Sequence, residues 1–319
     1  MIMHAAEGER PGVVIGIHGL ANKPPVAEKT RWWASAIREG LVRNEGLADP
    51  DFTFRFVYWA DLRYDVPLAC EDLPDPYRAV PGTDPFPDGG EAPTCTGHDI
   101  LATLYAGLER IQEMTGVTPV DDTILEHRFD DLWHYNVTQA FARSVRARLI
   151  EELVAHRDRR ILLVAHSMGA VIAYDTLRLL ERDDPSVRVA QFVTLGAPLG
   201  LAKVKLKIEA ETGSVRVPNN VARWTNLADG DDIVAVAGTL AADYAPSDAG
   251  VAVEDRRVIN DYHRLDGTRN HHKSYGYLRT PEFSRLAAGF LGPAGAGPSA
   301  DPRRPATSRS VQDTVRSRL

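Results

Sequence analysis

Short strand-like runs alternate with helical patterns along most of the chain. Val13 to Ile17 is a near-continuous apolar run, the pattern of a strand buried on both faces of a sheet. Further strands are predicted at residues 52–59, 161–165, 189–195, 221–227 and 251–259. Helices are predicted at residues 27–41, 136–156, 168–180 and 281–290, and Gly40 and residues 44–46 are interpreted as stop signals of the first. Strands separated by helices predict an α/β fold with a mostly parallel, doubly wound sheet.

Two segments break this alternation. Residues 61–131 are dense in Pro, Gly and Asp and contain one helical candidate at 100–114, so we expect a partly helical cap over a substrate site rather than a plain surface loop. Asp130, Asp131 and His134, at the end of this segment, are interpreted as a solvated surface. From residue 292 the chain is rich in Gly, Pro, Ala, Ser and Arg, which predicts a disordered tail. The predicted organisation is a core of residues 1–60 and 132–291, a cap at 61–131 and a tail at 292–319.

Composition narrows the class of protein. Of the 319 residues, 44% are hydrophobic and 25% are charged, which is ordinary for a globular enzyme with a substantial core. The formal charge of −7 offers no general attraction for nucleic acid or an anionic membrane. No segment has the length of an integral membrane helix. The first residues lack a secretory signal pattern, so we expect cytoplasmic residence, with export that uses no cleaved signal left open.

The two cysteines carry little information. Cys70 and Cys95 lie in the same Pro-rich stretch, so they could form one local bridge or stay as two thiols. Two cysteines make no disulfide framework, and we expect free thiols.

The strongest chemical signal is the hexapeptide Ala-His-Ser-Met-Gly-Ala at residues 165–170. It directly follows a predicted strand and precedes a predicted helix, which is the context of a nucleophile elbow around Ser167. A tight strand-to-helix turn needs small neighbours, and Ala165 and Gly169 meet that need. The turn would also aim the amide N–H of Met168, at a helix N-terminus, toward a developing oxyanion. A serine that merely caps the helix is the plainer alternative.

This motif resembles the serine elbow of lipases and esterases in the α/β-hydrolase superfamily. The resemblance extends, with gaps, from about Val13 to Phe290, whereas residues 61–131 resemble nothing that we can place. It implies an α/β-hydrolase fold, a serine nucleophile, and an acid and a histidine that follow the serine in that order. Ala165 stands where the usual motif has Gly. In this family the histidine at the position of His166 is usually not the catalytic base.

The resemblance also implies a place for the oxyanion hole. The first strand ends in His18-Gly19-Leu20, which is similar to the His-Gly segment after the first central strand of lipases. The amide of Leu20 would then be the second donor beside that of Met168, and Gly19 would let the backbone approach closely. Asn22 is a weaker contributor through its side chain, and an ordinary glycine turn is the alternative.

Few residues can act as the base and the acid. After Ser167 only His263, His271 and His272 remain, and His272-Lys273-Ser274-Tyr275 looks like the histidine loop of many lipases. His272 is therefore favoured as the base, although adjacent histidines also bind metals or cap turns. The stretch Asp232-Ile233-Val234 resembles the acid loop of lipases and favours Asp232, with Asp229 and Asp231 left as alternatives.

The predicted activity is hydrolysis of a carboxylic ester, with a small molecule or a lipid as the substrate. An amidase, a thioesterase or an acyltransferase would use the same residues, and a hydrolase fold without turnover would serve as a binding module. No cofactor or metal is expected, because the sequence has no zinc motif, no phosphate-binding loop and no calcium loop with its closing Glu.

Overall fold

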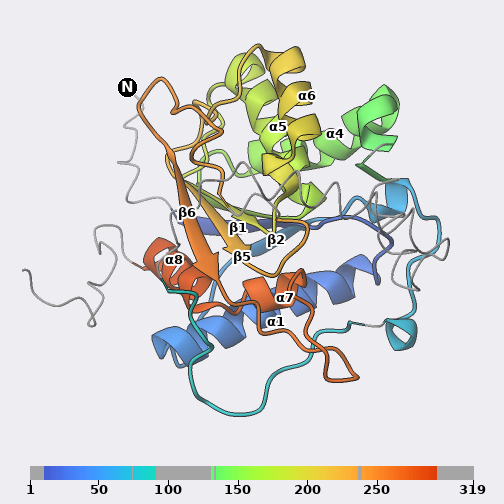
Figure 1. The fold of residues 1–319 in the computed structure, drawn as a ribbon, viewed down its shortest axis with the longest axis vertical. Helices are drawn as coiled ribbons and strands as arrows, with labels where there is room; N and C mark the ends of the chain where they lie inside the picture. The colour runs from blue at the N-terminus through green and yellow to red at the C-terminus, as the bar shows by residue number, and fades with distance from the viewer. Residues whose placement is uncertain (1–10, 74, 91–130, 133, 236–238, 293–319) are drawn as a thin grey trace, which may run out of the picture.

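A parallel sheet forms the centre of the molecule (Figure 1). The computed structural model describes residues 11–73, 75–90, 131–132, 134–235 and 239–292. Six strands pair in the order β2-β1-β3-β4-β5-β6, and every neighbouring pair is parallel. The strands are β1 (Gly12–Ile17), β2 (Phe54–Val57), β3 (Arg160–His166), β4 (Gln191–Leu195), β5 (Trp224–Asp229) and β6 (Val253–Val258). The predicted α/β fold class is confirmed.

Helices cover both faces of the sheet (Figure 1). One layer contains α1 (Val26–Glu45), α7 (Ser274–Tyr277) and α8 (Pro281–Leu291). The other contains α4 (Gln139–Ala155), α5 (Met168–Asp183) and α6 (Ala202–Thr212). The short 3₁₀ helices are η2 (Ala60–Leu62), η3 (Cys70–Asp72) and η4 (Pro198–Gly200). The sequence did not predict α6, because Val204 and Ile208 alone are buried on it and they make a weak helical pattern.

The central strands divide the core between the two layers. Val13, Ile15 and Ile17 of β1 pack into the core that contains α4 and α5. Val14, between them in sequence, packs into the core that contains α1 and α8. Successive side chains of a strand point to opposite faces, so a strand covered on both sides needs apolar residues at every position. The unbroken apolar runs of the sequence follow from this requirement.

One predicted helix boundary is wrong. Gly40, a predicted stop signal, lies inside α1, which continues to Glu45; the helix ends at Gly46, one of the predicted stop signals at residues 44–46, with a φ of 66°. A Cβ atom on Gly40 would lie 2.6 Å from the Oγ of Ser284 in α8. Gly40 therefore serves close packing between α1 and α8, and the left-handed Gly46 ends the helix.

The predicted cap is only partly within the described residues. Residues 91–130, which include the helix predicted at 100–114, lie outside them, as does the predicted tail from residue 293. Residues 75–90 run along α1 and α8 (Figure 1): the amide of Val80 donates to Glu39, and that of Gly89 donates to Glu282. The division into core and cap remains a prediction.

Two further predictions concern the cysteines and membrane-spanning helices. Cys70 is an exposed free thiol, and Cys95 lies outside the described residues. None of the helices in the described part of the chain has the length and apolarity needed to cross a membrane.

The strand order creates a typical position for a ligand site, at the edge of the sheet where the carboxyl ends of the strands lie. The chain passes from β1 outward to β2 and then returns to β3 on the other side of β1, so the connections diverge above β1 and β3. Ligands of open α/β sheets bind at such a switch point, beyond the carboxyl ends of the strands. Gly19 follows β1 and Ser167 follows β3 at this edge.

Candidate active site

Ser167 lies in a strained turn between β3 and α5. Its φ of 56° and ψ of −131° are unusual for a residue with a side chain. Two hydrogen bonds hold the turn: the amide of Ser167 donates to Leu195 at 3.0 Å, and that of Ala170 donates to the carbonyl of Ser167 at 2.9 Å. A Cβ on Gly169 would lie 2.6 Å from the carbonyl oxygen of His18. The need for a small residue here is thus set by the neighbouring β1 loop as well as by the turn itself.

Three side chains from distant segments meet at this turn. The Oγ of Ser167 lies 2.9 Å from the Nε2 of His272. The Nδ1 of His272 lies 2.8 Å from the Oδ2 of Asp232 and 3.0 Å from its Oδ1. All three side chains are buried. The result is a continuous path of hydrogen bonds from hydroxyl to imidazole to carboxylate, which is the geometry required to activate a serine.

Asp232 is held in its charged form. Burial alone would raise the pKa of this carboxyl group, but the charge of His272 and hydrogen bonds from His272, Tyr277 and the amide of Val234 outweigh burial and lower the pKa. The hydroxyl of Tyr277 donates to Oδ2 at 2.6 Å and accepts from the amide of Asp229 at 3.1 Å. Tyr277 carries no sequence signal of this role apart from its closeness to His272 along the chain.

Gly196 makes room for this pair of residues. It directly follows β4 and has a φ of 52°. A Cβ at this position would lie 2.6 Å from the Oδ2 of Asp232 and 3.1 Å from the Nδ1 of His272. Gly196 is not among the residues predicted for the site, although a glycine immediately after a buried strand is a visible signal that other atoms approach the backbone closely.

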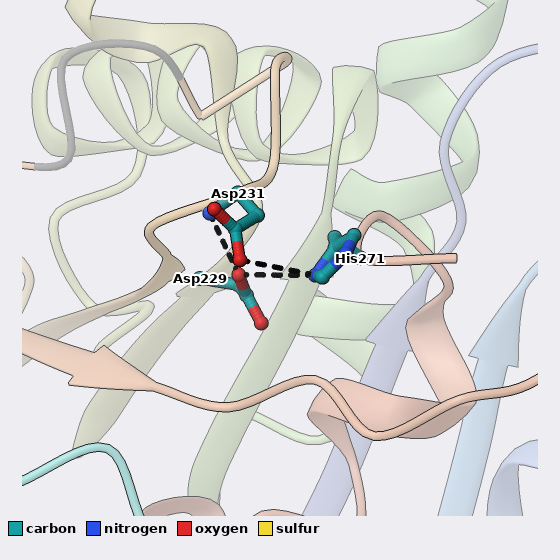
Figure 2. A group of neighbouring side chains, drawn as sticks. All are labelled: Asp229, Asp231 and His271. Atoms are coloured by element: carbon teal, nitrogen blue, oxygen red, sulfur yellow. Dashed lines mark hydrogen bonds and ion pairs between the residues drawn. The ribbon is translucent and has the colours of Figure 1, made fainter. Parts of the chain in front are cut away.

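The alternative histidine and acids form a second cluster beside the first. The side chains of His271, Asp229 and Asp231 point toward one another (Figure 2). The Nδ1 of His271 lies 3.3 Å from the Oδ1 of Asp229 and 3.9 Å from the Oδ2 of Asp231. One ligand atom from each of the three residues lies within 4.8 Å of the others, so this group is the candidate for a metal ion among the described residues. Asp229 also accepts hydrogen bonds from the amides of Asp231 and Asn260. The cluster ties the histidine loop to the acid loop. His263 is not part of this cluster: its Nδ1 lies 3.7 Å from the Oδ1 of Asp261.

The loop after β1 is clamped by Trp59. The amide of Trp59 donates to the Nε2 of His18, and its indole N–H donates to the carbonyl of His18, at 3.1 Å and 3.0 Å. The Nδ1 of His18 must then carry the proton, because it lies 2.7 Å from the carbonyl oxygen of Gly19. Burial and the charge of Lys23 lower the pKa of His18 well below its usual value. A neutral His18 of fixed tautomer therefore sets the path of Gly19.

Asp131 anchors the next part of the same loop. The prediction that it belongs to a solvated surface is wrong: its side chain is fully buried. It accepts from the amide of Ala21 at 2.8 Å and from the hydroxyl of Tyr64 at 3.0 Å, and it pairs with Arg63. Ala21 has a φ of 70°, a conformation that costs energy and needs such support. Asp130 lies outside the described residues, and no sequence pattern distinguished Asp131 from it.

The other predicted loop residues have clear positions. Leu20 lines a cleft beside Ser167, and Met168 is the first residue of α5, where backbone amides have no acceptor within their own helix. Asn22 uses both polar atoms of its side chain: it donates to the carbonyl oxygen of Val66, in the segment after β2, and accepts from the amide of Lys23 in its own loop. Asn22 therefore braces the loop.

His166 supports the histidine loop from beneath. Its Nε2 lies 2.7 Å from the carbonyl oxygen of His272 and must donate to it. Burial and the nearby His272 lower the pKa of His166 well below its usual value, so the ring is neutral. His166 thus contacts the backbone of His272, and the hydroxyl of Ser167 faces the imidazole of His272 instead.

A cleft of about 230 Å³ opens above Ser167. The β1 loop, the start of α1, the histidine loop and part of the segment after β2 form its walls. Its apolar lining includes Leu20, Trp32, Leu68 and Leu73.

Comparison with known proteins agrees with the fold. Residues 123–209 match the model of the lecithin:cholesterol acyltransferase family, a family of α/β-hydrolase type. The match includes β3, α5 and β4. No curated protein sequence matches the chain significantly. This match and the parallel sheet together fit a member of the α/β-hydrolase superfamily. The matched family points to an enzyme of acyl transfer or ester hydrolysis.

Proposed function

We propose that this chain is a serine esterase that cleaves carboxylic esters through Ser167, His272 and Asp232. The observation that carries the proposal is the unbroken path of hydrogen bonds from Ser167 through His272 to Asp232, with distances of 2.9 Å and 2.8 Å. Adjacent carboxylates and histidines are common, but a strained, buried serine at the end of that path serves no obvious purpose in stability.

The geometry supports acyl transfer in two steps. In the first, His272 Nε2 takes the proton of Ser167 while Oγ attacks the carbonyl carbon, and Asp232 stabilises the imidazolium that forms. The amides of Leu20 and Met168 would donate to the oxyanion, each contributing about 3 kcal/mol. His272 then protonates the leaving alcohol and an acyl-serine remains. In the second step His272 takes a proton from water as the oxygen of that water adds to the acyl carbon. The bond between the acyl carbon and the Oγ of Ser167 then breaks, His272 returns the proton to Oγ, and the acid is released.

The second candidate is acyl transfer to an alcohol other than water. It is favoured by the match to a family that is named for moving an acyl group between two lipids. The chemistry differs only in which hydroxyl attacks the acyl-serine. An amide or a thioester substrate would use the same residues.

Labelling with a serine-directed fluorophosphonate tests the nucleophile. We expect wild-type protein to be labelled, Ser167→Ala to be unlabelled, and Ser186→Ala, a change at an exposed serine, to behave as wild type. A folded wild-type protein that takes no label would contradict the proposal and favour a binding module.

Turnover of p-nitrophenyl esters from acetate to palmitate then measures the preferred chain length. Adding a primary alcohol to the same assay separates hydrolysis from transfer, since a transferase forms the new ester. Activity near zero across the series, in a protein that takes the label, would point to amides or thioesters.

A further inference from the structure

Lys29 is a buried amine on the wall of the catalytic cleft. It lies in the first turns of α1 and is 5% exposed. Its Nζ donates to the hydroxyl of Tyr275 at 2.9 Å and lies 4.5 Å from the centre of that ring. Among the described residues, no carboxylate lies within ion-pair distance of this Nζ. Burying an ammonium group without an opposite charge is costly, so the position calls for a reason.

Two further lysines line the same cleft. The Nζ of Lys23 donates to the carbonyl oxygen of Ala21 at 3.0 Å. The Nζ of Lys273 lies 3.8 Å from the Oδ2 of Asp75. Asp75 is the one carboxylate in the lining that the structure describes, and its Oδ1 also lies 3.5 Å from the Nε of Arg264. The described lining therefore carries three lysines and one aspartate, whereas the whole chain carries a formal charge of −7.

The charges of these lysines shift the pKa values of Lys29 and of His166. Burial lowers the pKa of Lys29 well below its usual value, and the charges of Lys273 and Lys23 lower it further. After burial and the charge of His272, the charges of Lys29 and Lys23 also help to lower the pKa of His166, which directly precedes Ser167. An anion in the cleft would relieve this repulsion and give Lys29 a counter-charge, which no described residue supplies. The N-terminus of the 20-residue helix α1, at the same wall, adds a favourable dipole.

We propose that the cleft recognises esters that carry an anionic oxygen group, a carboxylate or a phosphate, and that Lys29 binds this group. The inference rests on the proposed function, because it names the substrate class of the same site. The apolar lining of Trp32, Leu68 and Leu73 would hold the hydrocarbon part of such an ester. Lys273, which is more exposed and partly paired with Asp75, would assist.

Matched pairs of esters test the proposal. One pair places the charge on the acyl part: the mono-p-nitrophenyl ester of glutaric acid against p-nitrophenyl pentanoate. The other places it on the alcohol part: the butyryl ester of para-hydroxybenzoate against that of para-hydroxybenzamide. We expect kcat/KM to favour the charged member of at least one pair by about tenfold or more. Replacing the benzoate carboxylate with a phosphate then distinguishes the two anions.

Lys29→Met keeps the length of the side chain and removes the amine. We expect it to lower the ratio of kcat/KM for the charged over the neutral ester by at least about tenfold. Lys273→Met, at a position whose side chain is 22% exposed, should lower the same ratio by about threefold. Lys203→Met, at an exposed lysine of α6, is the matched control and should leave the ratio unchanged.

Failure of this inference is distinguishable from failure of the proposed function. If the wild type hydrolyses neutral esters as well as charged ones, and Lys29→Met does not change the ratio, the anion assignment is overturned and the esterase stands. If nothing is hydrolysed, calorimetric titration of Ser167→Ala with the same esters decides. Tighter binding of the charged member that is lost when Lys29→Met is added upholds the anion site, and equal binding overturns it.

Discussion

At the scale of single residues, the site depends on glycines that let neighbouring oxygen atoms approach the backbone closely, more than on charge. Ser167 adopts a positive φ, which costs about 1–3 kcal/mol in general and persists only where the surroundings enforce it. Gly169 and Gly196 supply the space: a Cβ on either would come within 2.6 Å of an oxygen of the site. A side chain at Gly169 or Gly196 would collide with neighbouring atoms. Gly250 also has a positive φ, but a Cβ there would have nothing within 4 Å.

Gly196→Ala therefore tests whether the contact between Asp232 and His272 limits the rate. The added methyl group must displace the carboxylate or the imidazole, and misplacement of about 1 Å costs roughly 100-fold in rate. We expect kcat for an ester to fall by about that factor, with KM little changed. Gly250→Ala, which introduces the same backbone strain in open space, is the control. Equal activity of the two variants would show that the contact is unimportant.

At the scale of elements, the loop between β1 and α1 is shaped by segments far away in the chain. Trp59, after β2, fixes His18, and Asp131, before α4, fixes Ala21. The loop carries Leu20 between these two anchors. The backbone path of the loop is therefore set by its contacts with these distant segments, and the residues of the loop alone do not determine it.

Asp131→Ala should loosen this loop. We expect kcat for ester hydrolysis to fall by about tenfold or more, since removal of one oxyanion donor costs about 100-fold and here the donor is displaced rather than removed. Asp131→Asn, whose amide oxygen can still accept from Ala21, should recover most of the rate. Asp61→Ala breaks the neighbouring exposed ion pair with Arg148 and should leave the rate unchanged. If Asp131→Asn were as slow as Asp131→Ala, the anchoring of Ala21 would not explain the loss.

At the scale of the whole molecule, the fold keeps two histidines neutral in its interior. His18 and His166 are buried at the switch point, and the pKa of each is lowered well below the ordinary value of 6.5, mainly by burial. Below pH 6.5 the unfolded chain takes up protons at these residues and the folded chain does not. Stability contributed by keeping them neutral is therefore lost as the pH falls from 6.5 toward the folded pKa values.

The pH dependence of unfolding measures this effect. Each histidine should contribute a slope of about 1.4 kcal/mol per pH unit within that window, with stability rising as the pH rises. His166→Gln can still donate to the carbonyl of His272 and does not titrate. We expect denaturant unfolding between pH 5 and 7 to show a shallower slope for this variant, by about that amount. Parallel curves for wild type and variant would contradict a neutral His166.

Much of the fold could be predicted from the sequence because its signals are local. Apolar runs marked the central strands β1 and β3, since burial on both faces favours apolar residues along the whole strand. Ser167 stood out because a strand, a small-residue turn and a helix follow one another directly. The sequence alone could not decide which carboxylate faces which imidazole. It also gave no sign that Asp131 is buried, that Gly196 must lack a side chain or that Lys29 faces the cleft. These features depend on the directions in which separate loops leave the sheet, and the packing of distant segments decides those directions.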